Sequence, residues 1–176
     1  MFLILIFAFS LLYSADDKEK LSVSLNLSGG SQGEENIEIG FSSNEIKNIS
    51  DEVEKIDGDF SLMLLENEYY ARNAVPIFAY YKIMSGKNYS MKIYLDDVLK
   101  SAENEINWYV SENDVSLGLE ASYGESQSAV DTVVHDSSKD YTSSGSIKLN
   151  IWTDYLIDAV PGIYKANLKL GVYSNS

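Results

Sequence analysis

The residues that most often carry out enzymatic chemistry are scarce in this sequence. His135 is the only histidine, and there is no cysteine. The stretch "HDSS" places His135 beside Asp136 and Ser137, but adjacent side chains at a strand end diverge, whereas a catalytic triad needs converging side chains. Cysteine nucleophiles and structural zinc sites cannot be built from this composition, and no nucleotide-binding or nucleophile-elbow motif is present. We therefore predict a protein without enzymatic activity and without a cofactor.

Carboxylates are abundant, with 27 Asp and Glu residues, so a calcium site has to be considered. Asp57 and Asp59 in "DGD", together with Asp96 and Asp97, supply hard oxygen ligands in predicted loops, although neither pair fits the twelve-residue loop of an EF-hand. Aspartate also favours turns because its side chain hydrogen-bonds the local backbone. These four residues are the calcium candidates, but solvated charge is the preferred interpretation, and no metal site is predicted.

Paired aromatic residues could form a platform for sugars. The pairs are Tyr69–Tyr70, Tyr80–Tyr81 and Trp108–Tyr109. Successive strand side chains point to opposite faces, so each pair is expected to send one ring into the core and one outward. Core packing is the preferred interpretation because large aromatics are usually buried, and a carbohydrate-binding module remains an alternative.

The charge of the chain restricts its partners. Lys and Arg number 13, which gives a net charge of −14. Such a field repels phosphate backbones and anionic headgroups, and no basic stripe is visible in the sequence. We predict no nucleic-acid partner, and no membrane insertion once the N-terminal segment 1–15 has been removed.

The first fifteen residues, "MFLILIFAFSLLYSA", are apolar from Phe2 to Leu12 and end in small residues. This length is typical of a secretory signal and too short for an ordinary membrane-spanning helix. The alternative is a buried N-terminal strand. We predict a signal peptide at 1–15 and a single domain at 16–176. An exported chain without cysteine is typical of bacterial envelope proteins, which indicates a secreted, periplasmic or cell-surface location.

Short segments with apolar residues at every second position dominate the chain. "LSVSLNLS" places Leu21, Val23, Leu25 and Leu27 on one face, and similar alternation recurs up to the C-terminus. About ten strands are predicted, at 21–28, 36–41, 60–66, 75–83, 88–95, 106–110, 115–123, 129–135, 146–152 and 164–172. This pattern predicts an all-β protein, an immunoglobulin-like antiparallel β-sandwich. A small eight-stranded outer-membrane barrel is the alternative.

Two stretches differ from the strand pattern. In "NEIKNISDEVEKIDGD" the residues Ile46, Ile49, Val53 and Ile56 follow a helical spacing, which predicts one or two helical turns that end at Gly58. "DDVLKSAE" predicts a single helical turn capped by Asp96. Both are expected to be short helical connections at an open end or edge of the β core.

Two longer stretches carry a resemblance. They are "FAYYKIMSGKNYSMKIYLDDVL" at 78–99 and "SIKLNIWTDYLIDAVPGIYKANLKLGV" at 146–172. They resemble the middle and the end of bacterial pilin-like sandwich subunits, namely the spore coat protein U family and the alternate-type fimbrial major subunits, whose last strand commonly begins Gly-x-Tyr. The resemblance covers roughly 80 residues, and it implies a structural subunit that assembles with other envelope or pilus subunits or with itself.

The same residues can be interpreted without the resemblance. Pro161 presets a turn, Gly162 tolerates a positive φ, and Tyr164 opens the apolar face of the last strand. A sandwich also has open edges whose backbone groups can pair with a strand from another subunit. The segment containing Leu21 to Leu27 would lie near the N-terminus after signal cleavage, so it is the candidate for exchange between subunits. The alternative is that it remains the first strand of its own sheet.

Overall fold

The computed structural model describes residues 22–30, 36–66, 70–102, 104–111, 130–154 and 163–175. The described residues form strands, turns and bends, without any helix. The strands are β1 (Ser22–Gly30), β2 (Ile37–Ser42), β3 (Lys55–Ile56), β4 (Gly58–Glu66), β5 (Tyr70–Asn73), β6 (Ile77–Met84), β7 (Asn88–Lys100), β8 (Glu105–Ile106), β9 (Trp108–Ser111), β10 (Val130–His135), β11 (Thr142–Asp154) and β12 (Ile163–Asn175). Within these ranges, nothing helical is long and apolar enough to cross a membrane.

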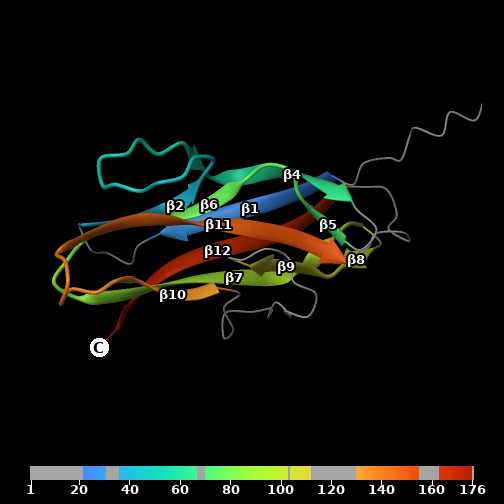
Figure 1. The fold of residues 1–176 in the computed structure, drawn as a ribbon. Coiled ribbons are helices and arrows are strands. Elements are labelled where there is room, and N and C mark those ends of the chain that lie inside the picture. The colour runs from blue at the N-terminus through green and yellow to red at the C-terminus, as the bar shows by residue number, and fades with distance from the viewer. Residues whose placement is uncertain are drawn as a thin grey trace, which may run out of the picture.

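The strands form two layers (Figure 1). The first layer has the order β10-β7-β12-β1-β4, and the second has the order β5-β11-β6-β2-β3. Pairing of β4 with β5 joins the layers along one side, while β8 pairs with β7 and β9 pairs with β11. Among the described strands, β10 and β3 end the order, so the layers have open edges and do not close into a barrel. The predicted all-β sandwich is confirmed.

The long strands β12 and β11 pair with their neighbours along most of their length. β12 pairs with β7 from Lys165 to Asn175, and β11 pairs first with β6 and then with β9 and β5. Neighbouring strands run antiparallel except for β1 and β12, which are parallel. The 115–123 strand prediction lies outside the described residues. The short strands β3 and β5 were not predicted, and the strand predicted at 106–110 covers parts of β8 and β9.

The core lies between the layers and follows the predicted alternation. On β12 the inward side chains are buried and the residues between them are exposed or half-buried. The buried set on β12 is Tyr164, Ala166, Leu168, Leu170 and Val172, and it meets Tyr89, Met91, Ile93 and Leu95 of β7 and Ile77, Ala79 and Ile83 of β6. Each fully buried large side chain contributes about 1.5–3 kcal/mol by leaving water.

The helix predicted after Asn44 is wrong. Residues 43–54 form a loop that lies over the outer face of β2, β6 and β11, where Ile46 is buried and Ile49 is exposed. The Asp51 carboxylate accepts hydrogen bonds from the backbone N–H groups of Lys47 and Asn48 at 2.8 and 2.9 Å. Such side-chain bonds offer the backbone an alternative to the helical ladder. The predicted helix end, Gly58, instead begins β4 with a φ of 68°.

The helical turn predicted at Asp96 is also wrong, because β7 continues through it to Lys100. Leu99 is buried in the core, so an extended chain places an apolar side chain where a helical turn would not. The backbone here pairs with β8 through Leu99 and Ile106 and with β12 through Lys100 and Lys165. Long-range pairing therefore overrides the local capping signal of the aspartate.

Candidate functional site

The strand proposed for subunit exchange lies inside the first layer, between β12 and β4. Val23, Leu25 and Leu27 belong to β1, whereas Leu21 lies outside the described residues. β1 aligns in parallel with Ile163–Gly171 of β12 and antiparallel with Met63–Gly58 of β4. The structure of the single chain thus places this segment in its own sheet, with a neighbour on each side.

This position has a consequence for the sheet. A central strand supplies the hydrogen-bond partners of both neighbours, so removal of β1 would leave β4 and β12 as two facing edges. The gap between them would have the width of a single strand. We call the space between β4 and β12 that β1 fills the β1 slot.

Of the residues predicted to open the last strand, only one is described. Tyr164 is fully buried and aligns with Val23 of β1, so the prediction that it begins the inward face of the last strand is confirmed. Pro161 and Gly162 lie outside the described residues. β12 therefore directs its apolar face toward the core from Tyr164 onward, and it forms one side of the β1 slot.

The calcium candidates do not share a loop. Asp57 is exposed between β3 and β4, while the backbone of Asp59 belongs to β4 and that of Asp96 and Asp97 belongs to β7. The expectation that all four lie in loops is therefore wrong for three of them. Within the part of the chain that the structure describes, no group of three or more His, Asp and Glu side chains could hold a metal ion.

His135 is buried, and both its ring nitrogens have partners. Nε2–H donates to the carbonyl of Ser85 at 2.8 Å, which leaves Nδ1 to accept the hydroxyl hydrogen of Ser143 at 2.7 Å. The carbonyl can only accept, so this tautomer is the one that satisfies both contacts. The ring links β10 in one layer to β11 in the other and to the turn before β7. We assign it a structural role.

Asp136 does not orient His135 as a triad would require. Its carboxylate accepts hydrogen bonds from the backbone and hydroxyl of Ser138, and it pairs with Lys139 at 3.0 Å. The bonds from Ser138 and then from Lys139 lower the pKa of Asp136 to about 2. Asp136 therefore stabilises the turn between β10 and β11 as an anion.

The aromatic pairs named in the sequence do not form an exposed platform. Trp108 and Tyr80 are buried, Tyr109 stacks on Trp152 with centroids 4.3 Å apart, and Tyr81 is half-buried. The predicted core packing is confirmed for Trp108, and Tyr80 is buried outside that core. Tyr69 lies outside the described residues, and only the backbone of Tyr70 is described.

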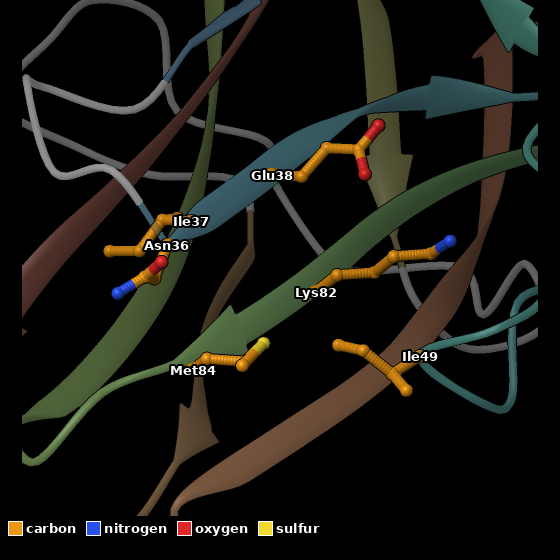
Figure 2. A pocket seen from close by; sticks show the side chains of 6 residues that line it. All are labelled: Asn36, Ile37, Glu38, Ile49, Lys82 and Met84. Atoms are coloured by element: carbon orange, nitrogen blue, oxygen red, sulfur yellow. The ribbon is translucent and has the colours of Figure 1, made fainter.

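A shallow depression lies where β2 and β6 meet Ile49 of the 43–54 loop. The depression has a volume of about 280 Å³, and its lining is formed by Asn36, Ile37, Glu38, Ile49, Lys82 and Met84. Figure 2 shows Ile49 and Met84 pointing toward each other below Lys82, with Glu38 on the neighbouring strand. The lining is mixed. Ile49 and Met84 contribute apolar side chains, and Glu38 of β2 lies opposite Lys82 of β6.

The charges in this depression are compensated by the protein itself. Glu38 pairs with Lys55 at 2.9 Å and accepts the Tyr80 hydroxyl at 3.3 Å, and its pKa is lowered chiefly by the bond to Lys55. Burial, and then the charge of Glu38, raise the pKa of Tyr80. Lys82 donates to the backbone carbonyl of Asp51 and so ties the loop to β6. These contacts fix the loop and leave no catalytic arrangement among these side chains.

Comparison with known proteins adds no relative. No protein-family model matches the chain, and no curated protein matches it. The geometry of the described residues therefore carries the functional interpretation.

Proposed function

We propose that this chain is an exported, non-enzymatic structural subunit of a bacterial cell surface or periplasm, which assembles with other subunits or with itself by strand pairing. The observation that carries the proposal is the position of β1 between β4 and β12. It is the first described strand of the chain, yet it lies inside a layer with a paired strand on each side. The cell location rests on the predicted signal peptide at 1–15.

Exchange of β1 between copies follows from this position. A β1 strand from another copy has the same sequence and can form the same backbone bonds to β4 and β12, so exchange preserves the pairing of the slot. Signal cleavage would place β1 near a free chain end, from which it can leave or enter the slot without threading a loop. The glycines at the end of β1, Gly29 and Gly30, would give the exchanging strand a flexible joint.

The described side chains support a non-enzymatic role. The single histidine uses both nitrogens to join the layers, and Asp136 is held in a turn. Glu38 is engaged by Lys55 and Tyr80. Groups that are held by structural contacts in this way are poor candidates for a general acid or base.

Truncation and complementation test the proposal. A chain that starts at Asp16 and a chain that starts at Gly29 are prepared, and the second is refolded with and without a peptide of residues 20–28, which ends where the shorter chain begins. We expect the shorter chain to be unstable alone and to form a one-to-one complex with the peptide, and the longer chain to form oligomers in which β1 comes from another copy. Native mass spectrometry and urea unfolding report both results.

The matched control is the same peptide with Asn26→Pro, which removes one backbone donor in the middle of the slot. This peptide should not restore stability. If the two chains are equally monomeric and equally stable, or if the proline peptide restores the shorter chain as well as the native peptide does, strand exchange through the slot is wrong.

A further inference from the structure

The outer face of the first layer carries an aromatic surface that the sequence pairs did not indicate. Tyr173 on β12 is 41% exposed, although the core side chains of the same strand are buried. Tyr94 on β7 stands beside it, with ring centroids 6.3 Å apart and an interplanar angle of 80°. Lys92 of β7 places its Nζ over the Tyr173 ring, 5.8 Å from the centroid. We call Tyr173, Tyr94 and Lys92 the tyrosine platform. It lies where the C-terminal end of β12 pairs with β7, whose other side pairs with β10 (Figure 1).

A glycine determines how the central ring lies. A Cβ atom on Gly171 would be 2.8 Å from both Cε2 and the hydroxyl oxygen of Tyr173 and 3.0 Å from its Cζ. The ring therefore leans back along its own strand and rests on the backbone of Gly171, two residues earlier. The Lys92 ammonium lies over the ring, and Tyr173 as a whole is 41% exposed. Only the absence of a side chain at 171 permits this orientation.

The surroundings of the ring are polar and directional. Lys92 forms an ion pair with Asp131 of β10 at 3.0 Å, so the ammonium is held at the edge of the platform. Beyond the ring, the Asn175 side chain donates to the Ser90 hydroxyl at 2.8 Å. Tyr94 presents its ring nearly perpendicular to Tyr173 and forms a wall along one side. Hydrogen-bonding groups thus border a partly exposed aromatic ring.

We propose that the tyrosine platform binds a neutral glycan chain through a pyranose ring stacked on Tyr173. One face of a pyranose presents C–H groups of weak positive charge, which match the negative π face of an aromatic ring. Its hydroxyls lie at the rim of the sugar, where the Lys92 ammonium and the Asp131 carboxylate can act as donor and acceptor. Tyr94 limits where along the glycan the stacked sugar can sit.

The charges of the platform favour an uncharged occupant. Lys92 is compensated by Asp131 within the same face. The chain as a whole carries a net charge of −14, which repels polyanionic glycans and nucleic acids over distances of about 10 Å at moderate salt. Recognition by stacking and hydrogen bonds is not opposed by this field, so neutral sugars are the class that fits.

Titration of the intact chain with soluble neutral oligosaccharides tests the inference, which is independent of the assembly role. Cellohexaose, chitohexaose and maltohexaose are added at millimolar concentration, with polygalacturonate as the charged comparison, and NMR shifts of the Tyr173, Tyr94 and Lys92 signals are followed. We expect at least one neutral hexasaccharide to shift these signals. Tyr173→Ala should weaken binding about tenfold, the loss expected for one stacked aromatic contact.

Two further variants separate the platform from general effects. Tyr141→Ala is the matched control because Tyr141 is an exposed tyrosine, 60% accessible, on the turn before β11; it should leave affinity unchanged. Gly171→Ala keeps Tyr173 but forces its ring off the backbone, and it should weaken binding like Tyr173→Ala while the circular dichroism spectrum is retained.

Three results would overturn the inference. The first is the absence of any shift with the neutral hexasaccharides. The second is binding that Tyr173→Ala and Tyr141→Ala affect equally. The third is binding of polygalacturonate alone, with an affinity that falls as salt is added.

Discussion

Replacement of His135 by alanine should weaken the contacts between the two layers at one end of the sandwich and so lower the stability of the protein. The imidazole is almost completely buried and bonds to the Ser85 carbonyl and the Ser143 hydroxyl. It also lies against the ring of Tyr89, with centroids 6.2 Å apart. His135→Ala removes both hydrogen bonds and the packing of the ring in one step, whereas His135→Phe keeps most of the volume and removes only the hydrogen bonds.

The expected loss can be worked out from these contacts. Each hydrogen bond contributes about 1 kcal/mol, and partners left without a bond in a partly buried site add a further penalty of about 1 kcal/mol. The space left beside Tyr89 adds about 1–2 kcal/mol. We expect His135→Ala to lower the free energy of unfolding by about 4–5 kcal/mol, which lowers the melting midpoint by about 8–20 °C in a domain of this size. His135→Phe should cost about 3 kcal/mol.

Urea unfolding followed by circular dichroism measures both values at neutral pH. Val133→Ala is the control, because Val133 lies on the same strand with its side chain 66% exposed, and it should change stability by less than about 0.5 kcal/mol. A loss for His135→Ala no larger than that of Val133→Ala would refute the role of His135 as a link between the layers.

Three other predictions follow from single contacts. Because bonds from Ser138 and Lys139 lower the folded-state pKa of Asp136 from 3.8 to about 2, the stabilisation that they provide is present above about pH 4 and is lost as the pH falls through about 2. Asp136→Asn should reduce the acid dependence of the urea midpoint in that window, and parallel curves for both proteins would contradict this. Gly145→Ala should destabilise by about 1–3 kcal/mol, because the new Cβ would lie 2.6 Å from the Tyr81 hydroxyl, and adding Tyr81→Phe should recover part of the loss; an equal loss in both backgrounds would argue against the clash. Millimolar calcium should leave the melting midpoint unchanged, and a rise of several degrees would reveal a metal site.

The alternation of apolar residues was sufficient to predict most long strands. Every second residue from Tyr164 to Val172 faces the core as expected, because successive side chains of a strand point to opposite faces and one face is buried. The pairing partners could not be predicted in this way. That β1 lies parallel to β12 depends on contacts between residues more than 130 positions apart, as for Ser22 and Ile163, and neither segment encodes them locally.

The two helical predictions failed for different reasons. Near Ile46 the helical spacing of apolar residues was misleading. Of the four residues in that spacing only Ile46 is fully buried, and the Asp51 carboxylate accepts the hydrogen bonds of the local backbone N–H groups. At Asp96 the capping residue was read correctly as a local preference, but cross-strand pairing of Leu99 and Lys100 prevailed. Local signals are weakest where long-range pairing competes with them.

The tyrosine platform shows which signal was overlooked in the sequence. Attention to adjacent aromatic pairs selected rings such as Trp108 and Tyr80, which are buried. The useful spacing was Gly171-x-Tyr173, since a glycine two positions before an outward tyrosine on a strand lets the ring lie flat on the backbone. The ring of Tyr94 joins it only through the pairing of β7 with β12, which the sequence does not specify.

The central claim, that β1 fills a slot between β4 and β12 in parallel register with the last strand, can be tested directly by cross-linking. The chain has no cysteine, so Asn26→Cys combined with Asn167→Cys introduces a single pair at aligned positions. Neighbouring strands lie about 4.8 Å apart, within the span of a disulfide. Mild oxidation should close this pair, within one chain in a monomer and between two chains in an oligomer that has exchanged β1. Asn26→Cys with Tyr173→Cys, which is six positions out of register, should remain reduced. Equal cross-linking of both pairs, or none for the aligned pair, would contradict the account.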